Sequence, residues 1–140
     1  MHASYEIMID APLEEVLNHY MSHESRLLWD KNLKEIRKFK EEDNSYLLIY
    51  EEQGGLFAMK ETTVKENLPD ALEHHYKVDG AKKVQKDYFI PYDDKSIWVV
   101  NCDFLFEQYT NLPKELFEQK IKDEMNRFKV FIEQTKGHSI

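Results

Sequence analysis

The sequence has few of the residues that disulfide-rich, disordered or membrane-spanning proteins need. Its 140 residues include one cysteine, four glycines and four prolines. No stretch approaches the roughly 20 consecutive apolar residues of a membrane span. A single cysteine excludes an intrachain disulfide, and so little glycine and proline leaves no room for low-complexity linkers. We therefore expect one ordered domain over residues 1–140, without membrane insertion, in the reducing cytoplasm.

Positive charge is also scarce. The chain has 19 lysines and arginines against 27 aspartates and glutamates, a formal net charge of −8. Such a chain repels nucleic acid phosphates unless a basic patch overrides the net charge, and no strong patch is evident. The lysine-rich stretches Lys31 to Lys40 and Lys82 to Lys86 contain acids or alternate between strand faces, so we interpret both as solvated surface. The sequence predicts no nucleic-acid partner.

Motifs for metal, nucleotide and nucleophile chemistry are missing as well. The chain has no nucleophile elbow, phosphate loop or dinucleotide fingerprint. His74 and His75 point to opposite faces of a strand and cannot bind one ion together. His19 and His23 have the spacing of a helical metal pair, but a helix break at Ser22 separates them. We predict no cofactor and no metal site, and we assign no catalytic residue.

The last third of the chain carries a strand pattern followed directly by a helix pattern. Apolar and polar residues alternate from Trp98 to Phe106. Residues Pro113 to Lys136 then carry an apolar stripe at helical spacing, made up of Phe117, Ile121, Met125, Phe128 and Ile132. Pro113 suits the first turn of this helix, and Gly137 suits its C-terminal cap. The apolar face of the strand needs a cover, and the stripe of the helix can provide it.

The rest of the chain predicts one strand, two short helices and a series of further strands. A strand at Tyr5 to Ile9 precedes a helix with Leu13, Val16, Leu17 and Tyr20 on its buried side, and Ser22 caps a second helix that ends near Trp29. Short polar turns separate six strands: Leu33 to Lys40, Ser45 to Glu52, Leu56 to Asn67, Ala71 to Val78, Val84 to Ile90 and Ser96 to Gln108. We predict an α+β fold of order β-α-α-β6-α, in which a curved antiparallel sheet of about seven strands wraps around the C-terminal helix.

Three segments resemble the START/Bet v 1-like helix-grip superfamily, which includes polyketide cyclase-like proteins. They are Ile9-Asp-Ala-Pro12, Arg26-Leu-Leu-Trp-Asp30 and Leu112-Pro113-Lys114. The second resembles the arginine-x-x-tryptophan-aspartate element of START domains and is the most specific. The resemblance implies a deep cavity between the sheet and the C-terminal helix, used by relatives for sterols, lipids, polyketides and other apolar molecules. Trp29 and Asp30 would fix the mouth of the fold, and Arg26 could pair with a carboxylate across it.

Strand alternation predicts which side chains face this cavity, because residues two apart share a face. Val84, Tyr88 and Ile90 make up one such face, and His74 points inward unless the register slips by one residue to His75. In the strand from Leu56 to Asn67 two opposite faces compete. The predicted ligand-binding residues are Met59, His74, Tyr76, Tyr88, Trp98, Val100, Cys102, Phe104, Phe117, Ile121, Met125 and Phe128. The histidine, the tyrosines, Trp98 and Cys102 also have a structural interpretation, as buried groups that fill the core.

Three functions stay open on this evidence. The first is noncatalytic binding of a small hydrophobic or aromatic molecule, lipid-like or polyketide-like. The second is a cyclase- or dehydratase-like enzyme that uses His74 or Tyr76 as general acid or base. The third is an interaction module, as in cochaperone-type relatives, with a filled interior and an outer sheet that docks a protein partner. A ligand-sized cavity would separate the first two from the third. No pattern predicts the oligomeric state.

Overall fold

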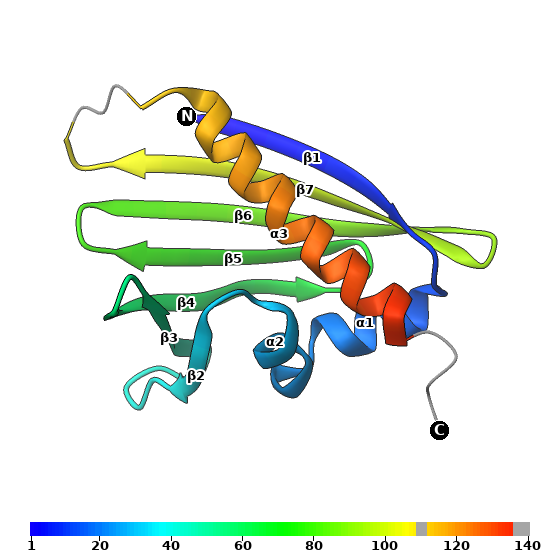
Figure 1. The fold of residues 1–140 in the computed structure, drawn as a ribbon, viewed down its shortest axis with the longest axis horizontal. Helices are drawn as coiled ribbons and strands as arrows, with labels where there is room; N and C mark the ends of the chain where they lie inside the picture. The colour runs from blue at the N-terminus through cyan, green and yellow to red at the C-terminus, as the bar shows by residue number, and fades with distance from the viewer. Residues whose placement is uncertain (109–111, 136–140) are drawn as a thin grey trace.

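One antiparallel sheet of seven strands, crossed by a long C-terminal helix, makes up the protein (Figure 1). The computed structural model describes residues 1–108 and 112–135. Its elements, in chain order, are β1 (His2–Ile9), α1 (Leu13–Tyr20), α2 (His23–Trp29), β2 (Leu33–Lys38), β3 (Ser45–Glu52), β4 (Gly55–Asn67), β5 (Ala71–Val78), β6 (Ala81–Tyr92), β7 (Lys95–Phe106) and α3 (Lys114–Thr135). The predicted α+β helix-grip fold and its order of elements are confirmed.

The strand order β1-β7-β6-β5-β4-β3-β2 places the first strand beside the last one. From β2 to β7 the chain forms a meander, because each strand pairs antiparallel with the next. Helix α3 runs diagonally across one face of the sheet, and α1 and α2 lie near its C-terminal half (Figure 1).

Local sequence signals account for several element boundaries. The Ser22 hydroxyl accepts a hydrogen bond from the Ser25 backbone N–H at 3.1 Å, which is the predicted N-cap of α2. Gln53 and Gly54 both have positive φ, 51° and 78°, as a tight hairpin turn between β3 and β4 requires. The turn after β6 falls at Asp93, with φ of 53°, so that strand is longer than predicted. The predicted helix cap at Gly137 lies outside the described residues.

Large aromatic side chains fill the interior beneath the C-terminal half of α3. The Phe128 ring, fully buried, lies 5.1 Å from the Trp29 ring and 5.3 Å from the Trp98 ring, measured between centroids. Tyr20 contacts the same cluster, with its ring 5.1 Å from Trp98. Edge-to-face packing of this kind stabilises aromatic pairs beyond the apolar area that they bury. The cluster joins α1, α2, α3 and β7 into the main hydrophobic core.

The inner face of β6 differs from the prediction. Tyr88 is 38% exposed and Ile90 43% exposed, so the inward assignment of Tyr88 is wrong. The buried residues of this strand are Gln85, Asp87 and Phe89, which occupy the alternate positions. Reading apolar residues as the buried face failed because two polar side chains point inward and satisfy each other: the Gln85 side-chain amide donates to Asp87 at 3.0 Å. In β5, by contrast, His74 is buried as predicted.

Candidate functional site

A cavity of about 470 Å³ lies between the N-terminal half of α3 and the inner faces of β3 to β7. Small-molecule sites in proteins commonly have volumes of roughly 300–1,000 Å³. Half of the twenty lining residues are aromatic or aliphatic: Tyr50, Phe57, Met59, Tyr76, Val78, Ala81, Phe104, Phe106, Phe117 and Ile121. The interior therefore has two parts, a packed core under the C-terminal half of α3 and an open cavity under its N-terminal half.

Five of the predicted ligand-binding residues line this cavity. They are Met59, Tyr76, Phe104, Phe117 and Ile121. Two opposite faces of β4 were possible inner faces from the sequence. Phe57 and Met59 both line the cavity, so their face of β4 points inward.

The other predicted residues lie elsewhere. Five belong to the packed core, each at most 1% exposed: Trp98, Val100, Cys102, Met125 and Phe128. His74 is buried beside Tyr76, with ring centroids 5.8 Å apart, but is not part of the cavity wall. Tyr88 points away from the interior on the opposite face of β6. Trp98 and Cys102 thus occupy positions that agree with their alternative interpretation as residues that fill the core.

An ion-pair network centred on Arg26 forms part of the cavity wall. The Arg26 guanidinium donates to Glu61 Oε2 at 2.6 Å and to Asp30 Oδ2 at 3.1 Å. The Tyr50 hydroxyl donates to the same Asp30 oxygen at 2.9 Å. The pairing of Arg26 with a carboxylate across the mouth of the fold is thus confirmed. Helix α2 supplies Arg26 and its C-terminal cap Asp30, so the network ties this helix to β3 and β4.

Burial and charge shift the protonation of this network. Burial alone would raise the pKa of Glu61, but Arg26, His74 and hydrogen bonds from Arg26 and Tyr76 together lower it. Burial raises the pKa of Asp30, and the nearby carboxylate of Glu124 adds to the effect against the opposing influence of Arg26. The hydroxyl of Tyr76 has a strongly raised pKa, because it is buried and lies near Glu61. Tyr76 is therefore a neutral hydrogen-bond donor at the cavity wall.

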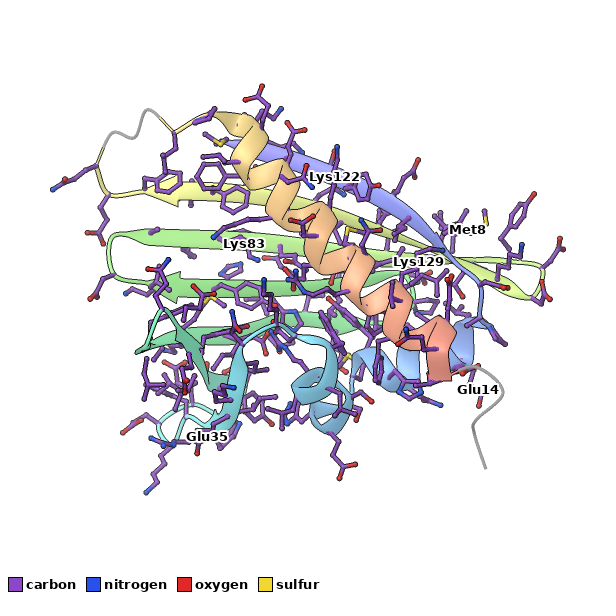
Figure 2. All side chains as sticks on the ribbon, in the orientation of Figure 1. Met8, Glu14, Glu35, Lys83, Lys122 and Lys129 are labelled. Atoms are coloured by element: carbon purple, nitrogen blue, oxygen red, sulfur yellow. The ribbon has the colours of Figure 1, made fainter. Side chains whose placement is uncertain are left out.

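Cationic side chains also face the cavity, which the sequence did not predict. Lys83 lines it with its Nζ 4.5 Å from the centroid of the Tyr76 ring, so the interpretation of Lys82 to Lys86 as solvated surface is wrong for Lys83. Figure 2 shows Lys83 on β6 beside α3, while Lys122 lies on the β1 side of that helix. Lys83 shares the inner face with Gln85 and Asp87, so the correct strand register was the signal that could have identified it.

A second polar network lies on the inner face of β6. The Tyr20 hydroxyl from α1 donates to Asp87, which also accepts from Gln85. Gln85 in turn accepts a weak hydrogen bond from the Cys102 thiol at 3.8 Å. Burial raises the pKa of Asp87 to about 7, against the hydrogen bonds from Tyr20 and Gln85. These groups satisfy one another and do not line the cavity, which assigns them a structural role.

Within residues 1–108 and 112–135, no cluster of histidine, cysteine, aspartate and glutamate side chains has an arrangement that could hold a metal ion. In the same part of the chain, no helix is long and apolar enough to cross a membrane.

Neither family models nor curated proteins match the chain. Solved structures do match over nearly its whole length. Ara h 8.0201 is 12% identical, with 96% of each chain covered and a TM-score of 0.78. A START superfamily protein from Mycobacterium smegmatis is 14% identical, with coverage of 95% and 97% and a TM-score of 0.74. The Zhui aromatase/cyclase from Streptomyces sp. R1128 is 9% identical, with coverage of 96% and 94% and a TM-score of 0.71. The protein has the START/Bet v 1-like helix-grip fold.

Proposed function

We propose that this protein binds a small apolar or aromatic molecule in the cavity between α3 and the sheet. The observation that carries the proposal is the cavity itself, about 470 Å³ in volume, with ten aromatic or aliphatic side chains among its twenty lining residues. Binding of an apolar ligand in a space of this size is favourable, because apolar surface on both partners is removed from water. Phe104 and Phe117, whose ring centroids lie 4.8 Å apart, offer a surface for an aromatic or alkyl group.

A few polar groups at the cavity wall would orient the ligand. Tyr76 and Tyr50 both line the cavity, and burial raises the pKa of each hydroxyl, so both stay neutral. Tyr50 donates its proton to Asp30 and Tyr76 donates its proton to Glu61, so the oxygen of each hydroxyl is left to accept a hydrogen bond. The Arg26 network holds the Tyr50 hydroxyl through Asp30. Ligand sites typically combine an apolar wall with a small number of fixed polar groups. A hydroxyl group of the ligand, which can donate to these tyrosine oxygens, therefore fits this part of the cavity.

Binding without a reaction is better supported than catalysis. One structural neighbour is an aromatase/cyclase, so the enzyme alternative deserves a test against the candidate residues. His74 does not line the cavity, and burial lowers its pKa. Tyr76 lines the cavity, but with its raised pKa it is suited to donate a hydrogen bond and not to remove a proton. The third alternative, an interaction module with a wholly filled interior, is not favoured because a cavity lies between the N-terminal half of α3 and the sheet.

Native mass spectrometry of the purified protein, followed by denaturing release, tests the proposal by identifying any copurified small molecule. Titration with the neutral fluorescent dye N-phenylnaphthylamine provides a second readout of an apolar site. Ala81→Phe should weaken dye binding because Ala81 lines the cavity, whereas Ala58→Phe places the same side chain on the exposed face of β4 and should not. An apo mass together with equal dye binding by both variants would contradict the proposal.

A further inference from the structure

We infer that the ligand is an anionic amphiphile whose carboxylate lies against Lys83 and Arg127 while its apolar part occupies the rest of the cavity. This inference rests on the proposed function and specifies the chemical class of the ligand. It starts from an unexpected distribution of charge. The chain as a whole has a formal net charge of −8, but the cavity wall has six cationic side chains and four acidic ones.

The cations at the cavity differ in whether they already have partners. Arg26 is held by Asp30 and Glu61 and is therefore neutralised. The other five cations have no carboxylate within salt-bridge distance among residues 1–108 and 112–135. Three of them are exposed to solvent, whereas Lys83 and Arg127 are half-buried. The Nε atom of Arg127 is buried and has no hydrogen-bond partner in the same part of the chain. A buried polar group without a partner is costly, so Arg127 favours a ligand that supplies an acceptor. Lys83 adds a half-buried positive charge at the same cavity.

The placement of Lys83 is hard to explain by stability alone. It occupies the inner face of β6, in alternation with Gln85 and Asp87, where a lysine contributes less to packing than an apolar residue would. Its Nζ lies over the Tyr76 ring, at the floor of the cavity. Arg127 approaches the same cavity from α3, on the opposite wall. A carboxylate between the two walls would accept hydrogen bonds from both, and a guanidinium can bind it with two parallel bonds.

The acidic side chains of the wall limit how the ligand can lie. Asp30 is engaged by Arg26 and Tyr50, while Glu124 lines the cavity from the same helix as Arg127. A carboxylate placed beside Arg26 would face Asp30, whose negative charge would repel it. The ligand is therefore expected to carry one anionic group, at Lys83 and Arg127, and a neutral remainder along Phe104, Phe117 and Met59.

The test uses three probes with the same alkyl chain and different head groups: decanoate, decanol and decylamine. Each displaces N-phenylnaphthylamine from the protein at neutral pH, and the inhibition constants are compared. Charge-assisted hydrogen bonds predict that decanoate binds about tenfold or more tightly than decanol, and that decylamine binds most weakly. Lys83→Met should weaken the binding of decanoate about tenfold and leave the binding of decanol unchanged.

Lys86→Met is the matched control, because Lys86 lies on the exposed face of the same strand and is absent from the cavity wall. It removes the same charge and should leave all three affinities unchanged. Lys83→Gln repeats the test with a polar replacement, and thermal unfolding verifies that each variant is folded. Equal binding of decanoate and decanol, or an equal loss for both in Lys83→Met, would overturn the inference while leaving the proposed function intact. Failure of all three probes and of the dye to bind would overturn both.

Discussion

Replacement of Arg26 by glutamine should lower the free energy of unfolding by about 3–5 kcal/mol at neutral pH, the usual cost of breaking a buried ion pair. Arg26 is the shared cation of two carboxylates, with Glu61 only 6% exposed at its side chain and Asp30 only 7%. Removing the guanidinium leaves both acids buried without a cation. Glu124 adds a further negative charge, since it already contributes to the raised pKa of Asp30. The loss should therefore fall in the upper part of this range.

The sign of the pH dependence follows from the same contacts. Burial opposes ionisation of Glu61, but Arg26 and His74 lower its pKa from the usual 4.5, so this pair stabilises the fold above about pH 4.5. That contribution is lost as the pH falls through the lowered pKa of the folded state. Without Arg26, burial raises the pKa of both carboxyl groups, and the variant takes up protons on folding. Its deficit relative to the native protein should shrink as the pH falls from about 7 to about 5.

Urea unfolding at both pH values, followed by the fluorescence of Trp29 and Trp98, measures this difference. Arg37→Gln is the control, because Arg37 pairs with Glu35 at 3.0 Å on the surface, where both side chains are about half exposed. It should change stability by no more than about 0.5 kcal/mol. A loss for the Arg26 variant as small as that of the control, or one that is the same at both pH values, would refute the reasoning.

Three further predictions concern the packed core and the cavity wall. Burial raises the pKa of Asp87 to about 7, so its protonated form stabilises the fold and this contribution declines as the pH rises from about 4 to 7; Asp87→Asn should flatten that decline in urea unfolding. Phe128→Ala should cost about 3–5 kcal/mol in the same assay, because Phe128 is fully buried, whereas Phe117→Ala at the half-exposed cavity wall should cost less than half as much. Burial raises the pKa of the Cys102 thiol to about 12, so iodoacetamide should modify Cys102 only after unfolding, as detected by mass spectrometry.

The fold was predictable because its signals are local and agree with one another. The helical stripe from Phe117 to Ile132 and the alternation from Trp98 onward both have a single interpretation, and each turn carries a residue suited to it. The inner face of β5 followed from the same alternation, with Leu72, His74 and Tyr76 all buried. Hydrophobic periodicity is sufficient wherever the buried face is the apolar one.

The site was predictable only in part, because its most informative residues break that rule. On β6 the buried positions are polar, so apolar periodicity selected the exposed face and missed Lys83 along with Asp87. Asp30 follows Arg26 at the ion-pair spacing of four residues, but the other partner, Glu61, lies on β4, and a strand far along the chain cannot be matched to a helix by spacing alone. The division of the interior was equally hidden, since Phe117 and Phe128 look alike in the sequence but line the cavity and fill the core respectively.

This division has a consequence for how stability and binding are distributed. Beneath the C-terminal half of α3, the rings of Trp29, Trp98 and Tyr20 pack in one cluster with Phe128. The N-terminal half faces the ends of the strands, where Ala81 is small and Lys83 projects into the cavity. Substitutions at the packed end should therefore change the free energy of unfolding, while those at Ala81 and Lys83 should change ligand affinity with little effect on stability. Stability and ligand affinity should therefore respond to substitutions at different ends of α3. The reason is that side chains at a cavity wall make fewer packing contacts than side chains in a core, so replacing them removes less stabilisation.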